Sequence, residues 1–149
     1  MIVSNPTTLK QRLLVLRIIW AALLFGECMF LGVIGGVILP HQPKPEHPQP
    51  IFVWVSLGML LTVIPVTFAI RSMIFKKSRA MGLLSPAAYS TGSIIFWAGC
   101  DAVAFFGLVV AIMNGSMWPT IVNVAIAMSL QVITFPVAGK LTATVDSMF

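Results

Sequence analysis

Four long apolar stretches of the chain constrain its fold more than any other feature. They run from about residue 13 to 39, 51 to 75, 89 to 113 and 118 to 138. A helix that crosses a bilayer needs roughly 20 apolar residues. Each stretch must satisfy its own backbone in lipid, and none alternates polar and apolar residues as a barrel strand does. We therefore predict an all-α integral membrane four-helix bundle, in which residues 1–149 form one transmembrane domain.

Few charged side chains are present to cover a water-soluble surface. Charged residues make up 9% of the chain and hydrophobic residues 58%, whereas about a quarter of a soluble domain is charged. This balance excludes a soluble enzyme, a disordered tail and a secreted disulfide scaffold. The sequence also has no nucleophile elbow, Walker loop, HExxH or CxxC motif. We therefore expect a protein that is not an enzyme and holds no cofactor.

The cations are distributed unequally between the two sides of the predicted bundle. Residues 40–50 form a proline-rich loop, and residues 71–85 form a basic loop. Of the nine Lys and Arg residues, only Lys44 falls on the side of the proline-rich loop. Cytoplasmic loops carry the excess of Lys and Arg. We therefore predict that both termini and the basic loop are cytoplasmic, with the proline-rich loop outside. The expected location is the inner membrane of a bacterium.

The formal net charge of +5 fits attraction to anionic lipid. Binding of nucleic acid is not expected, because the cations lie beside the apolar stretches. A cation near an anionic membrane surface contributes ~1 kcal/mol. Contact with lipid headgroups or with a cytoplasmic protein is expected at four cations of the basic loop: Arg71, Lys76, Lys77 and Arg79.

Glu27 and Asp101 lie near the middle of the first and third predicted spans. These two spans run in the same direction, so we expect the two carboxyls at similar depth. An ionised carboxylate at that depth costs about 2.5–3.5 kcal/mol on insertion scales, and no Lys, Arg or His lies in the central part of a span. The acids should therefore be neutral, or bonded to another subunit or to polar side chains of other spans: Thr62, Thr67, Ser129 and Gln131.

Three roles for these two acids are open from the sequence. They carry a proton or a cation, they form neutral hydrogen bonds between helices, or they recognise a ligand. An acid within a membrane is by default a candidate for function.

Small residues spaced four apart indicate where helix backbones could approach closely in lipid. The first span has a GxxxG pair, and the third has two pairs of small residues at the same spacing. We expect helix packing, within the chain or between copies, at these positions: Gly32, Gly35, Gly36, Ala98, Ala102, Gly107 and Ala111.

The residue types that bind soft metals are few and poorly placed. Cys28 and Cys100 each adjoin one of the acids, but neighbouring residues of a helix point about 100° apart. His41 and His47 lie in the proline-rich loop. We therefore predict two buried, inert thiols and no metal site.

A faint internal repeat relates the two halves of the chain. Phe30-Leu31-Gly32-Val33 matches Phe105-Phe106-Gly107-Leu108, and Val63-Ile64-Pro65-Val66 matches Thr134-Phe135-Pro136-Val137. The repeat predicts two helical hairpins in parallel orientation, each with one acid.

This pattern resembles the duplicated proteolipid (c-type) subunits of rotary ATPases over most of the chain. That family, however, carries its carboxyl in the second helix of a hairpin. Four spans with Glu27 midway through the first also resemble the small multidrug resistance transporters, in which the matching glutamate binds protons or cationic drugs.

Two functional hypotheses follow from these patterns. The first is a non-catalytic membrane subunit that associates with itself or with other membrane subunits through small-residue seams. The second is a proton- or cation-coupled translocator that uses Glu27 and Asp101.

Overall fold

The computed structural model describes residues 6–46, 49–80, 85–118 and 120–136, and these residues form helices and no strands. Helix α1 (Pro6–Val33) continues through a π-helical turn (Ile34–Ile38) into the short α2 (Leu39–His41). It is followed by α3 (Pro50–Ala80), α4 (Pro86–Asn114) and α5 (Ile121–Ile133). The prediction of an all-helical chain is confirmed for this part of the protein.

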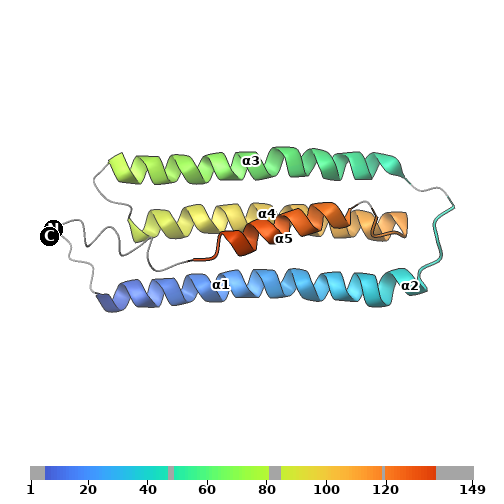
Figure 1. The fold of residues 1–149 in the computed structure, drawn as a ribbon, viewed down its shortest axis with the longest axis horizontal. Coiled ribbons are helices and arrows are strands. Elements are labelled where there is room, and N and C mark those ends of the chain that lie inside the picture. The colour runs from blue at the N-terminus through green and yellow to red at the C-terminus, as the bar shows by residue number, and fades with distance from the viewer. Residues whose placement is uncertain (1–5, 47–48, 81–84, 119, 137–149) are drawn as a thin grey trace.

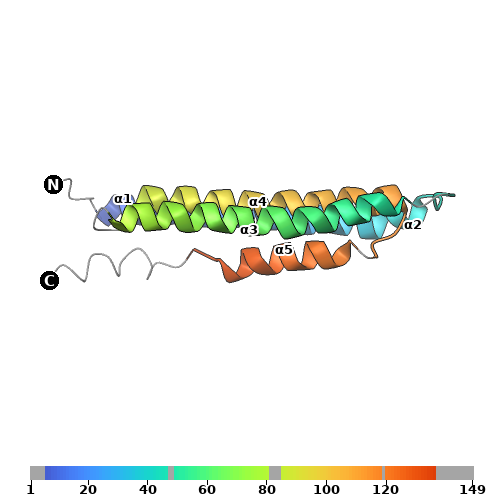
Figure 2. The same cartoon turned by 90° about the horizontal axis from the view of Figure 1, so that it is seen from above.

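Helices α1, α3 and α4 lie side by side in one layer, with α4 in the middle, and α5 covers one face of that layer (Figures 1 and 2). Successive long helices run in opposite directions (Figure 1). Helix α4 packs against α1, α3 and α5 and carries most of the buried residues. The helices of the expected first hairpin, α1 and α3, are separated by α4, so the two parallel hairpins remain a prediction.

Three helical segments are long and apolar enough to cross a membrane: Lys10–His41, Pro50–Arg79 and Pro86–Asn114. In an apolar 18-residue stretch of each span, only 11% of the residues are buried within the chain for the first two spans, against 56% for the third. Apolar surface left exposed on this scale requires lipid or a partner around it. The protein is therefore a membrane protein in which α4 is the inner helix.

The fourth helix is shorter than the predicted span 118–138. Helix α5 has 13 residues, which is about 20 Å at 1.5 Å per residue, and a bilayer core is ~30 Å thick. Residues 134–136 are not helical, and 119, 137 and 138 lie outside the described residues. Of the four predicted spans, α5 is thus the one that does not cross the bilayer core by itself within the described chain.

The π-helical turn marks the approach of α1 to a proline. The ring of Pro40 would clash with the carbonyl of Gly36, four residues earlier, in a regular α-helix. In the turn, the N–H of Leu39 bonds to the carbonyl of Ile34, five residues back. This wider turn lets the helix continue to His41 before the proline-rich loop begins.

The proline-rich loop is fastened to the end of α4. Gln42 Nε2 donates to the carbonyl of Ile112 (3.1 Å), and the Gln49 N–H donates to Asn114 Oδ1 (2.9 Å). Gly115 ends α4 with φ +62°, and a Cβ at this glycine would lie 2.7 Å from Pro45 Cδ. Glycine is required here by both its backbone conformation and the proline packed on it.

The start of α1, the end of α3 and the start of α4 lie at one end of the molecule, and the proline-rich loop lies at the other (Figure 1). This end, called the basic end below, carries all described Lys and Arg residues of the helices, whereas Lys44 lies at the opposite end. Both chain termini, Lys140, His47 and residues 81–84 of the basic loop lie outside the described residues. The cytoplasmic side of the termini therefore remains a prediction.

Tight packing within the layer occurs at glycines of α4 that the spacing argument does not single out. A Cβ at Gly99 would lie 2.6 Å from Thr67 Cγ2, and one at Gly92 would lie 2.8 Å from Phe75 Cε1, both on α3. A Cβ at Gly107, which the sequence does indicate, would lie 3.4 Å from Val124 Cγ2 of α5.

Of the other predicted packing positions, one is buried and the rest are exposed. Ala111 is buried, whereas Ala98 and Ala102 are exposed. A Cβ at Gly32, Gly35 or Gly36 would meet nothing within 4 Å, and all three glycines are exposed. Within the described part of the chain, the GxxxG pair is therefore not a packing seam. The physical reason is that α4 contacts α1 along the opposite side, where Glu27 lies.

Candidate functional site

Glu27 lies in a buried polar cluster formed by α1, α4 and α5. Its side chain has no exposed surface, and neither has that of Gln131 on α5. Gln131 Nε2 donates a 2.7 Å hydrogen bond to Glu27 Oε1. Among the four partners that the sequence suggests, Gln131 is confirmed, while the other three donate their hydroxyls to carbonyls of their own helices: Thr62, Thr67 and Ser129.

The carboxyl of Asp101 on α4 lies close enough to that of Glu27 for the two side chains to interact. Asp101 directly follows Cys100, the middle residue of the 29-residue α4. The two acids therefore meet at one depth, about halfway along the central helix. Unlike Glu27, Asp101 is partly exposed at the surface of the chain.

Among the described residues, three buried oxygen atoms of this cluster have no hydrogen-bond donor: Glu27 Oε2, Asp101 Oδ1 and Gln131 Oε1. An ionised carboxylate only accepts hydrogen bonds, and two adjacent carboxylates repel each other when both are ionised. A single proton held between the acids supplies the missing donor to the pair and removes one of the two charges. The arrangement is therefore chemically suited to bind a proton.

Two tryptophans hold the end of α5 against the layer. Trp20 of α1 donates its Nε1–H to the carbonyl of Gln131 (2.9 Å). Trp97 of α4, which is fully buried, donates its Nε1–H to Thr134 Oγ1 (3.0 Å). These bonds place the Gln131 amide against Glu27. The sequence shows Trp20 and Trp97 on the faces of the two acids, but it does not indicate that α5 supplies their acceptors.

Arg17 interacts with the segment that follows α5 and not with the acids. Its guanidinium lies 5.5 Å from the ring centroid of Phe135, and its Nε donates to the carbonyl of Pro136 (3.4 Å). Phe135 in turn packs edge-to-face on Trp20, with 4.8 Å between the ring centroids. The contacts of Arg17 therefore reinforce the attachment of α5 to α1 on the side toward the basic end.

Arg71 differs from the other three cations with which the sequence groups it. Its side chain is 9% exposed and its guanidinium lies 5.3 Å from the ring centroids of both Phe75 and Phe96. Lys76, Lys77 and Arg79 are exposed. The structure separates Arg71 from them because its register on α3 turns it toward α4, where the glycine at 92 leaves room for its stem.

The two cysteines also differ from each other. Cys100 is buried beside the acid pair, whereas Cys28 is exposed on α1. The expectation of a buried thiol is therefore confirmed for Cys100 and wrong for Cys28, because α1 turns only one side toward α4 and α5. Within the described residues, no three His, Cys, Asp or Glu side chains are grouped in a way that could hold a metal ion.

Comparison with protein-family models, curated proteins and solved structures finds no match for this chain. The resemblances to proteolipid subunits and to small multidrug transporters therefore remain predictions from the sequence. The case for a function rests on the chemistry of the polar cluster itself.

Proposed function

We propose that this protein is a proton-coupled membrane translocator, in which the Glu27–Asp101 pair binds and releases one proton at mid-membrane. The observation that carries the proposal is the pair of facing carboxyls whose Glu27 Oε2 and Asp101 Oδ1 have no donor in the described structure. The alternative of a purely structural pair uses the same hydrogen bonds but gives no reason for two acids where one acid and one amide would suffice.

A bound proton lowers the negative charge of this cluster. The donor to Glu27 is the neutral amide of Gln131, and the described surroundings of the two acids include no basic side chain in contact with them. In this apolar setting a carboxylate pair with a net charge of −2 is strongly disfavoured. One bound proton leaves a single negative charge shared by the two carboxyls, and the Gln131 N–H donates a hydrogen bond to one of them.

Asp101 is the group through which we propose that the proton exchanges. Glu27 is enclosed by three helices, whereas Asp101 is partly exposed at the side of α4. A donor or acceptor from water or from a neighbouring protein therefore reaches Asp101 first. The shared proton leaves and returns through Asp101, and the pair carries a charge of −2 only between release and rebinding. In this mechanism Gln131 is a positioning residue, because it orients one oxygen of Glu27 and leaves the other toward Asp101.

The test is passive proton flux in proteoliposomes that carry an imposed potassium diffusion potential. Glu27→Gln and Asp101→Asn should each reduce the flux at least tenfold, and Glu46→Gln, an acid of the exposed proline-rich loop, is the matched control. Equal proton flux in the wild type, in both acid variants and in protein-free liposomes would show that the protein does not transport protons.

A second function is favoured by a different observation: the exposed Gly32–Gly36 face of α1, which none of the described residues covers. We propose, as the alternative, a non-catalytic subunit of a bacterial inner-membrane assembly that packs on a second copy or another subunit through this face. The exposed Cys28 lies one turn before Gly32. Copper-catalysed disulfide formation between copies at Cys28 should fall in Gly32→Leu, whereas Gly26→Leu, earlier on α1, is the control. A protein that stays monomeric at every concentration contradicts this alternative.

A further inference from the structure

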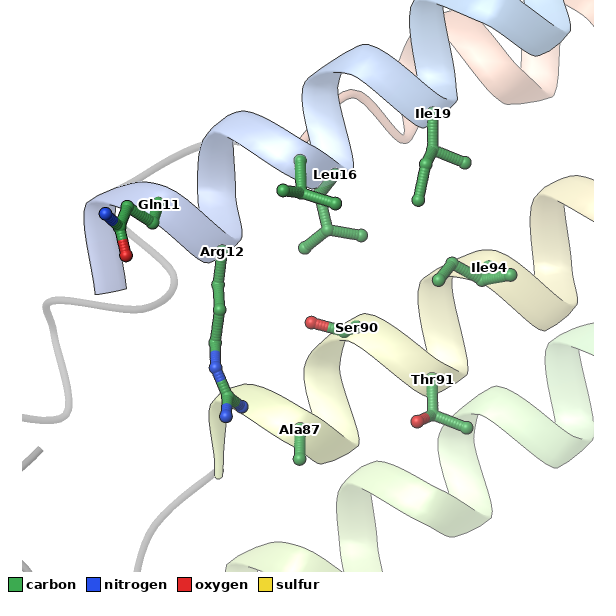
Figure 3. A pocket seen from close by; sticks show the side chains of 9 residues that line it. Gln11, Arg12, Leu16, Ile19, Ala87, Ser90, Thr91 and Ile94 are labelled. Carbon is green, nitrogen blue, oxygen red and sulfur yellow. The ribbon is translucent and has the colours of Figure 1, made fainter. Parts of the chain in front are cut away.

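A groove of about 500 Å³ lies between the first turns of α1 and the first turns of α4, at the basic end. Its walls are apolar side chains from both helices, including Leu16, Ile19 and Ile94. Gln11, Ser90 and Thr91 add polar side chains to the lining, and Figure 3 shows Arg12 extending from α1 toward the first turn of α4, near Ala87. The groove is separate from the Glu27–Asp101 pair and shares no residue with it.

The charge in this groove is not balanced by the described protein. The four acidic residues of the chain are Glu27 and Asp101 at mid-membrane, Glu46 in the loop at the opposite end, and Asp146 outside the described residues. Arg12 is exposed and has no described acid at its end of the molecule. The positive end of the α4 helix dipole lies at the same place and favours an anion there. The mouth of the groove is therefore complementary to a negatively charged group.

The position of the groove along the helices matches the headgroup level of a bilayer. Helix α4 has 29 residues, so it is about 44 Å long at 1.5 Å per residue. A bilayer with its headgroups is ~40–45 Å thick. When α4 spans it, the first turn of α4 and the Arg12 guanidinium lie among the headgroups, while Leu16, Ile19 and Ile94 lie one to two turns deeper, among the acyl chains.

We propose that this groove is a binding site for an anionic phospholipid. The phosphate group lies between Arg12 and the first turn of α4, and one acyl chain follows the apolar walls toward Ile19 and Ile94. The combination of one cation at the mouth with apolar walls behind it distinguishes this site from the exposed cations of α3, which can attract a headgroup but offer no groove for a chain. The site does not depend on the proposed proton binding.

The test is native mass spectrometry of the full chain in mild detergent, titrated with phosphatidylglycerol or with phosphatidylcholine. Arg12→Ala should weaken phosphatidylglycerol binding about fivefold, the contribution of one cation at a membrane surface, and Arg12→Lys should retain most of it. Ala87→Trp, which fills the mouth of the groove, should reduce the binding of both lipids. Lys76→Ala removes an exposed cation at the same end and should change binding less than twofold.

Two outcomes overturn the proposal. If Lys76→Ala weakens binding as much as Arg12→Ala and Ala87→Trp has no effect, the lipid senses only the diffuse charge of the basic end. If glycerol phosphate without acyl chains displaces phosphatidylglycerol at equal concentration, the site binds a free phosphate and the apolar walls contribute nothing.

Discussion

Gln131 Nε2 and Glu27 Oε1 are joined by a 2.7 Å hydrogen bond between two fully buried side chains 104 positions apart in the sequence. Through this bond, the 13-residue helix α5 contributes directly to the acid pair on α1 and α4.

Replacing Gln131 with Leu should destabilise the protein by about 1–3 kcal/mol, because Glu27 then keeps two buried oxygens and loses the amide donor that the described structure gives it. The free energy of unfolding, measured by denaturation in mixed detergent micelles, checks this expectation. Ser129→Ala on the same helix removes an exposed hydroxyl that bonds only to its own helix, and it is the control. Equal stability of the two variants would show that the Gln131–Glu27 hydrogen bond does not contribute to the free energy of unfolding.

Infrared difference spectra should reveal the proton held by the acid pair. The carbonyl stretch of a protonated carboxyl is expected in the wild type at neutral pH, because two ionised carboxyls in contact repel each other in an apolar site. The band should shift or vanish in Glu27→Gln and in Asp101→Asn, and it should persist in Glu46→Gln. A wild-type spectrum that contains only ionised carboxylates would contradict the shared proton.

Gly99→Ala should destabilise the protein by about 1–3 kcal/mol through overpacking, since the new Cβ would lie 2.6 Å from Thr67 Cγ2. Thr67→Ser removes that methyl group and should restore part of the loss. The matched control is Gly32→Ala, where a Cβ meets nothing within 4 Å and no loss is expected. If Gly99→Ala is as stable as Gly32→Ala, α3 and α4 are not in close contact at this level.

Removing the indole donor of Trp97 should loosen the end of α5. Trp97→Phe loses the 3.0 Å bond to Thr134 Oγ1 and part of a fully buried ring, so we expect a loss of about 1–3 kcal/mol and faster amide hydrogen exchange in residues 121–133. Trp54→Phe, at an exposed tryptophan of α3, is the control. Unchanged exchange in α5 would show that Trp97 does not anchor it.

Single cysteines introduced at the two ends should be labelled from opposite sides of the membrane. In a background without Cys28 and Cys100, Lys77→Cys should react with a membrane-impermeant maleimide only from the cytoplasmic side, and Lys44→Cys only from the outer side. Everted and right-side-out vesicles separate the two cases. Labelling of both from one side would contradict the predicted orientation and the membrane crossing of α3.

Part of this architecture is predictable from the sequence because hydropathy and helix formation are local properties. The apolar stretches at 51–75 and 89–113 lie within α3 and α4, and the stretch at 13–39 falls within the continuous helix from α1 to α2. The similar depth of Glu27 and Asp101 also follows from local reasoning, since two parallel spans of similar length place their middle residues at one depth, but their side-by-side position does not. The limit of α5 at Ile133 was not predictable from an apolar stretch that continues beyond it.

Which faces of the helices meet was decided only by the tertiary structure. The GxxxG motif of α1 is exposed, while Gly92 and Gly99, which lie in no such motif, carry the contact between α3 and α4. The sequence placed Arg71 among surface cations and Gln131 among four possible partners. Burial of Arg71 between two rings and selection of Gln131 both depend on α4 lying in the middle of the layer with α5 across it. Helix order and rotation arise from contacts between distant segments, so no local pattern of residues specifies them.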